Sequence, residues 1–148
     1  MGAIALEIKT GTYFELGTAA DELRRLVFID EQGVPEEEVF DALNLQAIHI
    51  VAFDADKPAA TARVWSNGDV WRIGLVAVAR EKRSQHVGES VMRAAIKYIA
   101  SNGGREIFLT AQQEVCGFYE TFGFTPCGEA EVFESGFVLV PMKLCLSP

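Results

Sequence analysis

Runs of apolar residues separated by turn residues predict strands along the first half of the chain. Apolar and polar positions alternate over residues 4–9, as in an edge or half-buried strand. Three further runs have the length of a strand: 48–53, 60–65 and 70–78. A turn at 54–58 separates the first two of these runs, and Ser66-Asn67-Gly68-Asp69 between the last two is a strong hairpin signal.

Helical periodicity appears in two longer segments. Thr18 has the form of a helix N-cap with Asp21 in the first turn, apolar residues follow at helical spacing over 23–27, and Gly33-Val34-Pro35 marks the end. A second helix of about four turns is predicted after residue 86. Its apolar face consists of Val91, Met92, Ala95, Ile96 and Ile99, and Asn102-Gly103-Gly104 stops it.

The remaining third of the chain continues the alternation of strands and helices. Residues 106–111 read as a strand, 115–122 as a short helix closed by Gly123, and 132–133 and 137–143 as two last strands. The chain contains no repeat, low-complexity segment or linker. Residues 1–148 are therefore expected to form one mixed α/β domain.

Composition narrows the class of protein. A chain of 148 residues that is 49% apolar can bury one sizeable core. No apolar run approaches the ~18–20 residues of a membrane span, and the N-terminus lacks the basic region of a secretory signal. Three cysteines without CxxC spacing suggest reduced thiols in a cytoplasmic protein. With only His49 and His86, no metal site is expected.

The charge is acidic overall and unevenly distributed. A net charge of −8 argues against general nucleic-acid binding. Residues 26–56 contain no Lys or Arg, whereas residues 80–105 contain six cations and two acids. This asymmetry indicates either one site for an anion and another for a cation, or two solvated faces of opposite sign.

The stretch from Arg80 to Val91 joins the strand at 70–78 to the second helix. A helix N-terminus offers unpaired N–H groups and a partial positive charge, and Gly88 permits close approach of an anion. Arg83, Ser84 and Gln85 add donors. By composition alone, the stretch is either a phosphate-binding loop or a charged surface turn.

Three motifs in a fixed order resemble one protein family. Val76-Ala77-Val78 followed by Arg83-Ser84-Gln85-His86-Val87-Gly88 resembles the acetyl-CoA-binding motif of the GNAT superfamily of N-acetyltransferases, Arg/Gln-x-x-Gly-x-Gly/Ala. Gly117-Phe118-Tyr119-Glu120-Thr121-Phe122-Gly123-Phe124 is similar to the Phe-Tyr-Glu-x-x-Gly-Phe helix of the family. Val27-Phe28-Ile29-Asp30-Glu31-Gln32-Gly33-Val34-Pro35 is similar to a stretch in one bacterial branch.

The resemblance implies a GNAT-like fold, with a central mixed, largely antiparallel sheet flanked by helices. It also implies transfer of an acetyl group from acetyl-CoA to a primary amine of a small molecule or peptide, without a metal. N–H groups of the strand at 75–78 would stabilise the tetrahedral oxyanion, and Tyr119 would protonate the departing thiolate. The implied cofactor-binding residues are Val76, Ala77, Val78, Arg83, Ser84, Gln85, His86, Val87, Gly88, Glu89, Ser90, Gln112 and Tyr119.

The base that deprotonates the amine has several candidates. Glu31 lies in the stretch that would border the acceptor site, although a solvated carboxylate at a helix end is an equal interpretation. His49 lies in the apolar run at 48–53, where a hydrogen-bonded core histidine is the better interpretation. Ordered water is a third candidate. Cys116 is interpreted as a small buried thiol.

Two departures from the family motif support a second hypothesis. His86 stands where the family prefers glycine, and Glu89 places a carboxylate in the first turn of the helix. A domain that keeps the GNAT fold as a ligand-binding or sensing module, with little or no transfer, is therefore the alternative function. Because family members are often dimers, a homodimer is also compatible with the resemblance.

Overall fold

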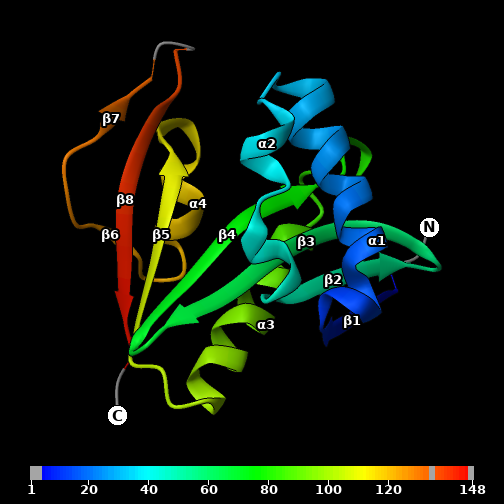
Figure 1. Ribbon diagram of the computed structural model, residues 1–148, viewed down its shortest axis with the longest axis horizontal. Helices are drawn as coiled ribbons and strands as arrows, with labels where there is room; N and C mark the ends of the chain where they lie inside the picture. Colours follow the sequence, from blue (N-terminus) through cyan, green and yellow to red (C-terminus); the bar gives the residue numbers. More distant parts are fainter. Residues whose placement is uncertain (1–4, 134–135, 147–148) are drawn as a thin grey trace.

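The computed structural model describes residues 5–133 and 136–146 as one open mixed sheet with helices on both faces (Figure 1). The strands are β1 (Leu6–Gly11), β2 (Ile48–Asp54), β3 (Lys57–Asn67), β4 (Val70–Val78), β5 (Glu106–Gln112), β6 (Thr125–Pro126), β7 (Glu131–Val132) and β8 (Val138–Cys145). The helices are α1 (Tyr13–Arg24), α2 (Glu36–Val39), α3 (Val87–Ser101) and α4 (Cys116–Glu120). Short 3₁₀ turns occupy Ala42–Leu45, Arg80–Lys82 and Gln113–Val115.

The strands follow the order β1-β2-β3-β4-β5-β8-β6, and β7 pairs with β8. Every pairing is antiparallel except that of β4 with β5, which is parallel. Within the described residues, the expected mixed, largely antiparallel sheet flanked by helices is confirmed. No described helix has both the length and the apolarity that a membrane crossing requires.

Alternation along the central strands assigns the helices to opposite faces of the sheet. On β2, Ile50 and Ala52 belong to the main core together with the apolar face of α3. The intervening Val51 packs against Leu16 and Ala20 of α1. Figure 1 shows α1 and α2 on one side of the sheet and α3 on the other. The apolar faces of the helices and the alternating apolar residues of the strands are thus buried against each other on both faces of the sheet.

The first helix begins earlier than predicted. Thr12, rather than Thr18, is the N-cap, and the Glu15 carboxylate accepts hydrogen bonds from the Thr12 N–H at 2.9 Å and the Thr12 hydroxyl at 3.1 Å. Thr18 lies inside the helix because the buried face starts at Leu16. The predicted end is confirmed, since Gly33 adopts φ +73°.

Other boundaries differ in smaller ways. The predicted turn at 54–58 contracts to Ala55 and Asp56, and Lys57 and Pro58 join β3 beside an irregularity in its register with β2. The sequence pattern gave no sign of the short elements α2 and β6. Residue 4 of the first predicted strand and residues 134–135 of the last turn lie outside the described residues.

A π-helical segment, Arg25–Glu31, continues α1 without a break. Its wider turn changes which residues face the sheet, and Val27 becomes buried. The segment brings Glu31 next to Arg83, which also bonds the carbonyl of Val78 at the end of β4.

Six polar residues beneath α1 form a buried polar cluster: Asp21, Arg24, Asp41, Asn44, His49 and Arg63. Arg63 bonds the Asp41 carboxylate through both terminal nitrogens, at 2.7 and 3.2 Å. The Asn44 amide oxygen accepts from Arg24 and from Arg63. The cluster fastens α1 and the turn at Ala42–Leu45 to β2 and β3.

His49 is the neutral member of this cluster. Its Nδ1 accepts from Arg24 Nη2 at 3.0 Å, so its Nε2 carries the proton and donates to the Asn44 carbonyl at 2.8 Å. The interpretation of His49 as a hydrogen-bonded core residue is confirmed, because its side chain is fully buried. Burial, more than the adjacent guanidinium groups, lowers the pKa of His49 below its ordinary value.

This lowered pKa predicts acid sensitivity. Below about pH 6.5 an unfolded chain protonates His49 more readily than the folded chain does. The free energy of unfolding therefore decreases as the pH is lowered, by up to about 1.4 kcal/mol per pH unit. We expect the urea midpoint of the wild-type protein to decline between about pH 7 and pH 5. His49→Gln should flatten this decline, whereas His86→Gln, which removes the other histidine at an exposed position, should retain it. An equal decline in wild type and His49→Gln would contradict the assignment.

Candidate active site

The centre of the sheet is split between β4 and β5. Their parallel pairing is limited to Trp71–Ile107 and Arg72–Phe108, after which the strands separate. On the other edge of β4, Ala77 pairs with Thr61 and Gly74 with Arg63, so two residues of β4 oppose one of β3. This is a β-bulge at Leu75 and Val76, and Leu75 adopts φ +46°. Beyond Arg72, the second half of β4 therefore points backbone groups into an opening rather than at β5.

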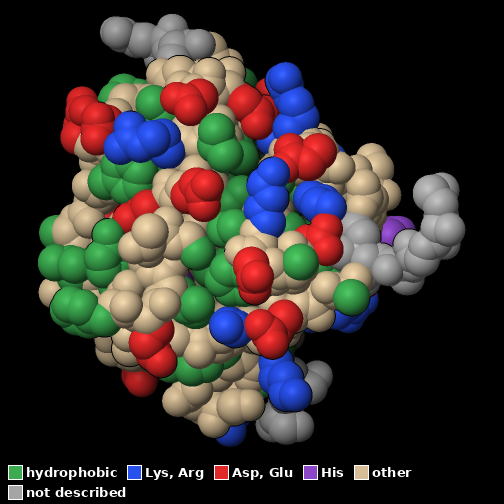
Figure 2. All heavy atoms as spheres, turned by 90° about the vertical axis from the view of Figure 1, so that its right-hand side faces the viewer, with side chains coloured by type: hydrophobic (Ala, Val, Ile, Leu, Met, Phe, Trp, Pro, Cys, Tyr) green, Lys and Arg blue, Asp and Glu red, His purple; other side chains and the backbone are tan. Residues whose placement is uncertain are grey.

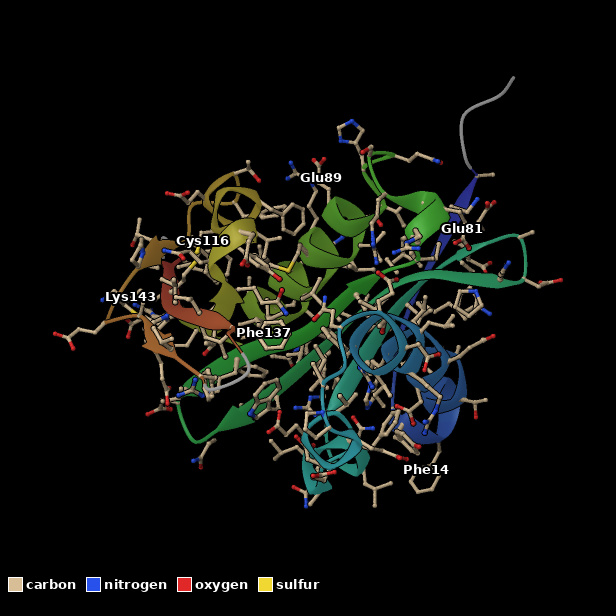
Figure 3. The ribbon with its side chains drawn as sticks, turned by 90° about the horizontal axis from the view of Figure 1, so that it is seen from above. Phe14, Glu81, Glu89, Cys116, Phe137 and Lys143 are labelled. Carbon is tan, nitrogen blue, oxygen red and sulfur yellow. The ribbon has the colours of Figure 1, made fainter. Side chains whose placement is uncertain are left out.

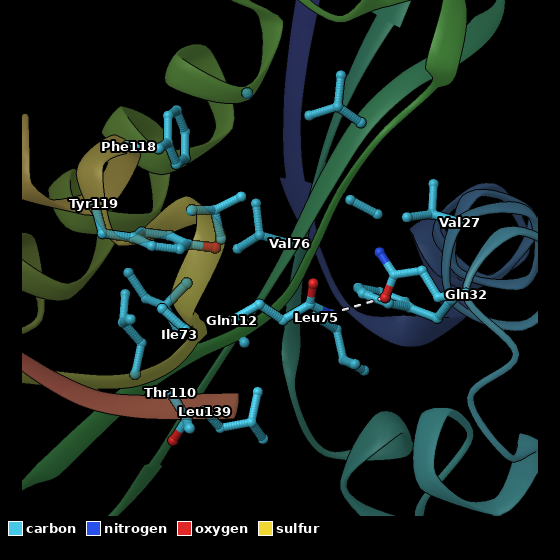
Figure 4. A pocket seen from close by; sticks show the side chains of 18 of the residues that line it. Val27, Gln32, Ile73, Leu75, Val76, Thr110, Gln112, Phe118, Tyr119 and Leu139 are labelled. Carbon is cyan, nitrogen blue, oxygen red and sulfur yellow. Dashed lines mark hydrogen bonds between the residues drawn. The ribbon is translucent and has the colours of Figure 1, made fainter. Parts of the chain in front are cut away.

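The opening is the entrance to a cleft of about 1540 Å³. Its floor is β4 from Ile73 to Val78 and the end of β5. One end, which we call the cofactor end, is lined by the loop at 82–84 and the start of α3. The other, the acceptor end, is lined by the segment 27–39 and by residues of the β7–β8 region. Figure 4 shows side chains from both sides converging over Leu75 and Val76.

The cofactor end has the geometry of an anion-binding loop. Ser84 and His86 have φ of +69° and +62°, and His86 is the residue immediately before α3. No described side chain caps this helix, so its first N–H groups face outward. A Cβ on Gly88 would lie 3.0 Å from Val78 and 3.4 Å from Phe118, so glycine lets the helix end approach β4. His86 thus has the left-handed backbone conformation that glycine adopts most readily.

Arg83 is held by Glu31. Its two terminal nitrogens donate to the two oxygens of Glu31 at 3.0 and 2.9 Å, and Nε and Nη2 also donate to the Val78 carbonyl. The hydrogen bonds that the guanidinium donates stabilise the charged carboxylate and so lower the pKa of Glu31. The structure thus brings together the residue predicted to bind phosphate and the residue predicted as a base.

The other charges at this end are paired as well. Glu89 accepts two hydrogen bonds from Arg93 at 2.9 and 2.7 Å, which lowers the pKa of Glu89, and lies 3.3 Å from the His86 ring. Lys82 pairs with Asp54. On the face shown in Figure 2, cationic and acidic side chains are interspersed. The carboxylate of Glu89 is therefore engaged along the helix by Arg93.

Tyr119 enters the cleft from α4. Its ring packs between Phe118 and Phe124, with centroids at 5.1 and 6.3 Å, and only 9% of the residue is exposed. Figure 4 shows its hydroxyl pointing across the cleft toward Val76. Burial raises the pKa of Tyr119 well above its ordinary value, so the phenol keeps its proton at neutral pH. Cys116 is half-buried rather than fully buried, and partial burial raises the pKa of its thiol.

Gln112 ends β5 inside the cleft and donates to the Gln32 side-chain oxygen at 2.8 Å (Figure 4). Gln32 was absent from the predicted site, although it lies next to Glu31 in the bacterial motif. The sequence signal was therefore present, but the bond spans 80 positions and only the fold reveals it.

Eleven of the thirteen residues predicted to bind the cofactor line the cleft; Gln85, Ser90 and the predicted base Glu31 do not. The lining includes Val76, Ala77, Val78, Arg83, Ser84, His86, Val87, Gly88, Glu89, Gln112 and Tyr119. Gln85 donates to the Glu81 carbonyl, Ser90 donates to the Val87 carbonyl, and Glu31 lies behind Arg83. His49 is also outside the cleft. Within the described part of the chain, no three His, Cys, Asp or Glu residues are grouped to hold a metal ion.

A split mixed sheet, whose central helix has a glycine in its first turn, is the arrangement that the resemblance to acyltransferases implies, and sequence comparison identifies the class. The family described as acetyltransferase (GNAT) domain matches residues 26–146. The chain therefore belongs to the GNAT acetyltransferase family. It is 32% identical to the uncharacterized N-acetyltransferase YjcF of Bacillus subtilis over 114 residues, which cover 77% of this chain and 81% of YjcF.

Protein ElaA of Escherichia coli is 30% identical over 118 residues, or 76% of each chain. The crystal structure of Escherichia coli ElaA superposes with a TM-score of 0.84 at 26% identity and covers 94% of this chain and 99% of ElaA. An acyl-CoA N-acyltransferase from Pseudomonas aeruginosa has the same fold, with a TM-score of 0.83 at 24% identity over 94% of this chain and 99% of that one.

The left-handed residue before α3 generates a stability prediction. A side chain in this conformation costs roughly 1–2 kcal/mol, and glycine removes that cost while adding about 0.5–1 kcal/mol of unfolded-state entropy. His86→Gly should therefore stabilise the protein by about 0.5 kcal/mol, measured by urea unfolding. Gln85→Gly, next to it but without positive φ, should destabilise. Loss of stability in both variants would mean that the His86 side chain contributes more than its backbone strain.

Proposed function

We propose that the protein transfers an acetyl group from acetyl-CoA to a primary amine. One observation carries the proposal. The cleft between the diverging strands β4 and β5 combines an uncapped helix start, backbone groups of a bulged strand and a buried phenol. These are the groups needed to bind a pyrophosphate, to stabilise an oxyanion and to protonate a leaving group.

The cofactor end would hold the pyrophosphate of the co-substrate. The N–H groups at the start of α3 and the left-handed residues Ser84 and His86 form a concave run of donors. Arg83 adds a cation that can exchange its carboxylate partner for a phosphate. The pantetheine arm would then extend along β4 toward Tyr119.

The transfer step would proceed by direct attack. The neutral amine forms a C–N bond to the thioester carbonyl, and the oxyanion accepts hydrogen bonds from N–H groups of the bulge near Leu75 and Val76. The C–S bond then breaks, and the thiolate takes the proton of the Tyr119 hydroxyl. The raised pKa of Tyr119 keeps the phenol protonated at neutral pH, so that a proton is present for the thiolate.

The amine must lose one proton before the attack, and the second proton, lost after the attack, restores the phenol of Tyr119. Glu31 is the carboxylate candidate for the base, but its ion pair with Arg83 lowers its pKa and weakens it in that role. The geometry favours water in the cleft as the proton acceptor and Glu31 as the group that orients Arg83.

The test of cofactor binding is a calorimetric titration with acetyl-CoA in the absence of an acceptor. We expect micromolar affinity for the wild type, and about tenfold weaker binding for Arg83→Ala. Glu31→Gln removes a competing carboxylate and should tighten binding while leaving turnover within a few-fold. The control Lys97→Ala removes an exposed cation of α3 outside the cleft.

Each alternative has its own result in this experiment. A turnover loss of about 100-fold in Glu31→Gln would instead make Glu31 the base. No binding at millimolar acetyl-CoA in the wild type would refute the proposal and favour a ligand-binding or sensing module that keeps the GNAT fold.

Replacement of the phenol tests the acid. Tyr119→Phe should reduce kcat by about 100-fold, because the thiolate loses its proton donor, while the affinity for acetyl-CoA stays within twofold. Tyr98→Phe in α3, whose ring packs on Trp71, is the matched control and should retain full activity. An unchanged kcat in Tyr119→Phe would remove this residue from the mechanism and leave protonation to water.

A further inference from the structure

The acceptor end of the cleft is predominantly apolar. One wall consists of Phe28, Val34 and Pro35, and the opposite wall of Phe133, Phe137 and Leu139. Phe133 is 40% exposed at this end. Phe137 lies above the diverging strands in Figure 3. Two aromatic or aliphatic walls on either side of a catalytic opening are suited to a flat or elongated apolar group.

The two ends of the cleft differ in charge: cationic side chains line the cofactor end, and a carboxylate lines the acceptor end. Among the described lining residues, every cation lies between positions 82 and 93, and each is paired with a carboxylate. The charged lining residue of the acceptor end is Glu38, in the acidic run Glu36-Glu37-Glu38 of α2. The acceptor end therefore attracts an ammonium group and offers no described cation to a carboxylate.

A hydrogen-bonded amide pair lies between the two ends. Because Gln112 donates to Gln32, the remaining atoms of the pair are the Gln112 oxygen and the Gln32 nitrogen, for which no described residue is a further partner. Figure 4 shows this pair above Leu75, at the bulge. The free oxygen is an acceptor for an amine N–H next to the place where the thioester would lie.

We propose that the acceptor is a primary amine on an apolar, otherwise uncharged body, such as an arylalkylamine or an alkylamine. The proposal rests on the proposed function and names its substrate class. The ammonium group is drawn in over α2, the body packs between the two apolar walls, and the nitrogen lies at the Gln32–Gln112 pair. An amino acid is excluded because its carboxylate has no cationic partner and faces Glu38. A polyamine is disfavoured because its second ammonium would lie between apolar walls, where Glu38 is the one described lining carboxylate.

Three matched acceptors test this class once acetyl-CoA binding has been measured. 2-Phenylethylamine carries the apolar body alone, phenylalanine adds a carboxylate, and 1,5-diaminopentane replaces the ring with a second cation. We expect kcat/KM to be about 100-fold higher for 2-phenylethylamine than for phenylalanine, with the reaction monitored through the CoA thiol that it releases. The ratio to 1,5-diaminopentane should be at least about tenfold.

Two phenylalanine variants locate the effect in the cleft. Phe137→Ala should raise KM for 2-phenylethylamine about tenfold and leave the affinity for acetyl-CoA unchanged. Phe14→Ala removes the same side chain from the outer side of α1, where it is 90% exposed (Figure 3), and should change neither quantity. Gln32→Leu should raise KM for the amine without weakening the binding of acetyl-CoA.

The outcomes separate this inference from the function on which it rests. Acetyl-CoA binding with equal or faster transfer to phenylalanine or 1,5-diaminopentane overturns the apolar-amine class but leaves the transferase intact. Acetyl-CoA binding without transfer to 2-phenylethylamine also overturns the class. Absence of acetyl-CoA binding refutes the transferase itself, and the inference with it. Equal KM values for Phe137→Ala and the wild type would place the acceptor elsewhere.

Discussion

The candidate active site depends on two central strands that pair only near their beginnings. β4 pairs with β5 only at its beginning, and a bulge at Leu75 and Val76 disrupts its register with β3. Backbone N–H groups in the middle of a sheet normally have partners, because an unpaired buried group costs about 1–3 kcal/mol. The divergence leaves such groups facing a cleft, where a ligand or water can satisfy them. The site is thus a property of the sheet before any side chain is considered.

The periodic part of this fold was predictable from the sequence. The strands around the Ser66–Asp69 turn and the helix carrying Val91, Met92 and Ala95 follow from local pattern alone. The start of α1 was misplaced because Thr12 and Thr18 are both plausible caps, and the capping contact of Glu15 decides between them. The π-helical segment changes the helical period itself, so an analysis based on a period of 3.6 residues cannot locate it.

The site was predictable as a list of residues but not as an arrangement. The motifs supplied Arg83, Glu31 and Tyr119 separately, and no local pattern pairs an arginine with a carboxylate 52 positions away. Gln32 and the buried Arg24 and Arg63 were missed for the same reason. A long polar side chain in a strand or helix is usually solvated, and only tertiary contacts show that these residues are enclosed.

The ion pair of Arg83 with Glu31 joins the two halves of the cleft into one thermodynamic system. Arg83 belongs to the loop before α3, whereas Glu31 ends the segment that also carries Phe28 and Gln32. An anion that binds Arg83 in place of Glu31 removes a stabilising contact from the segment Arg25–Glu31, which borders the acceptor end of the cleft. By linkage, a ligand that moves this segment must alter the affinity of the loop by the same factor. The salt bridge of Arg83 with Glu31 is therefore the contact through which the affinities of the two ends of the cleft influence each other.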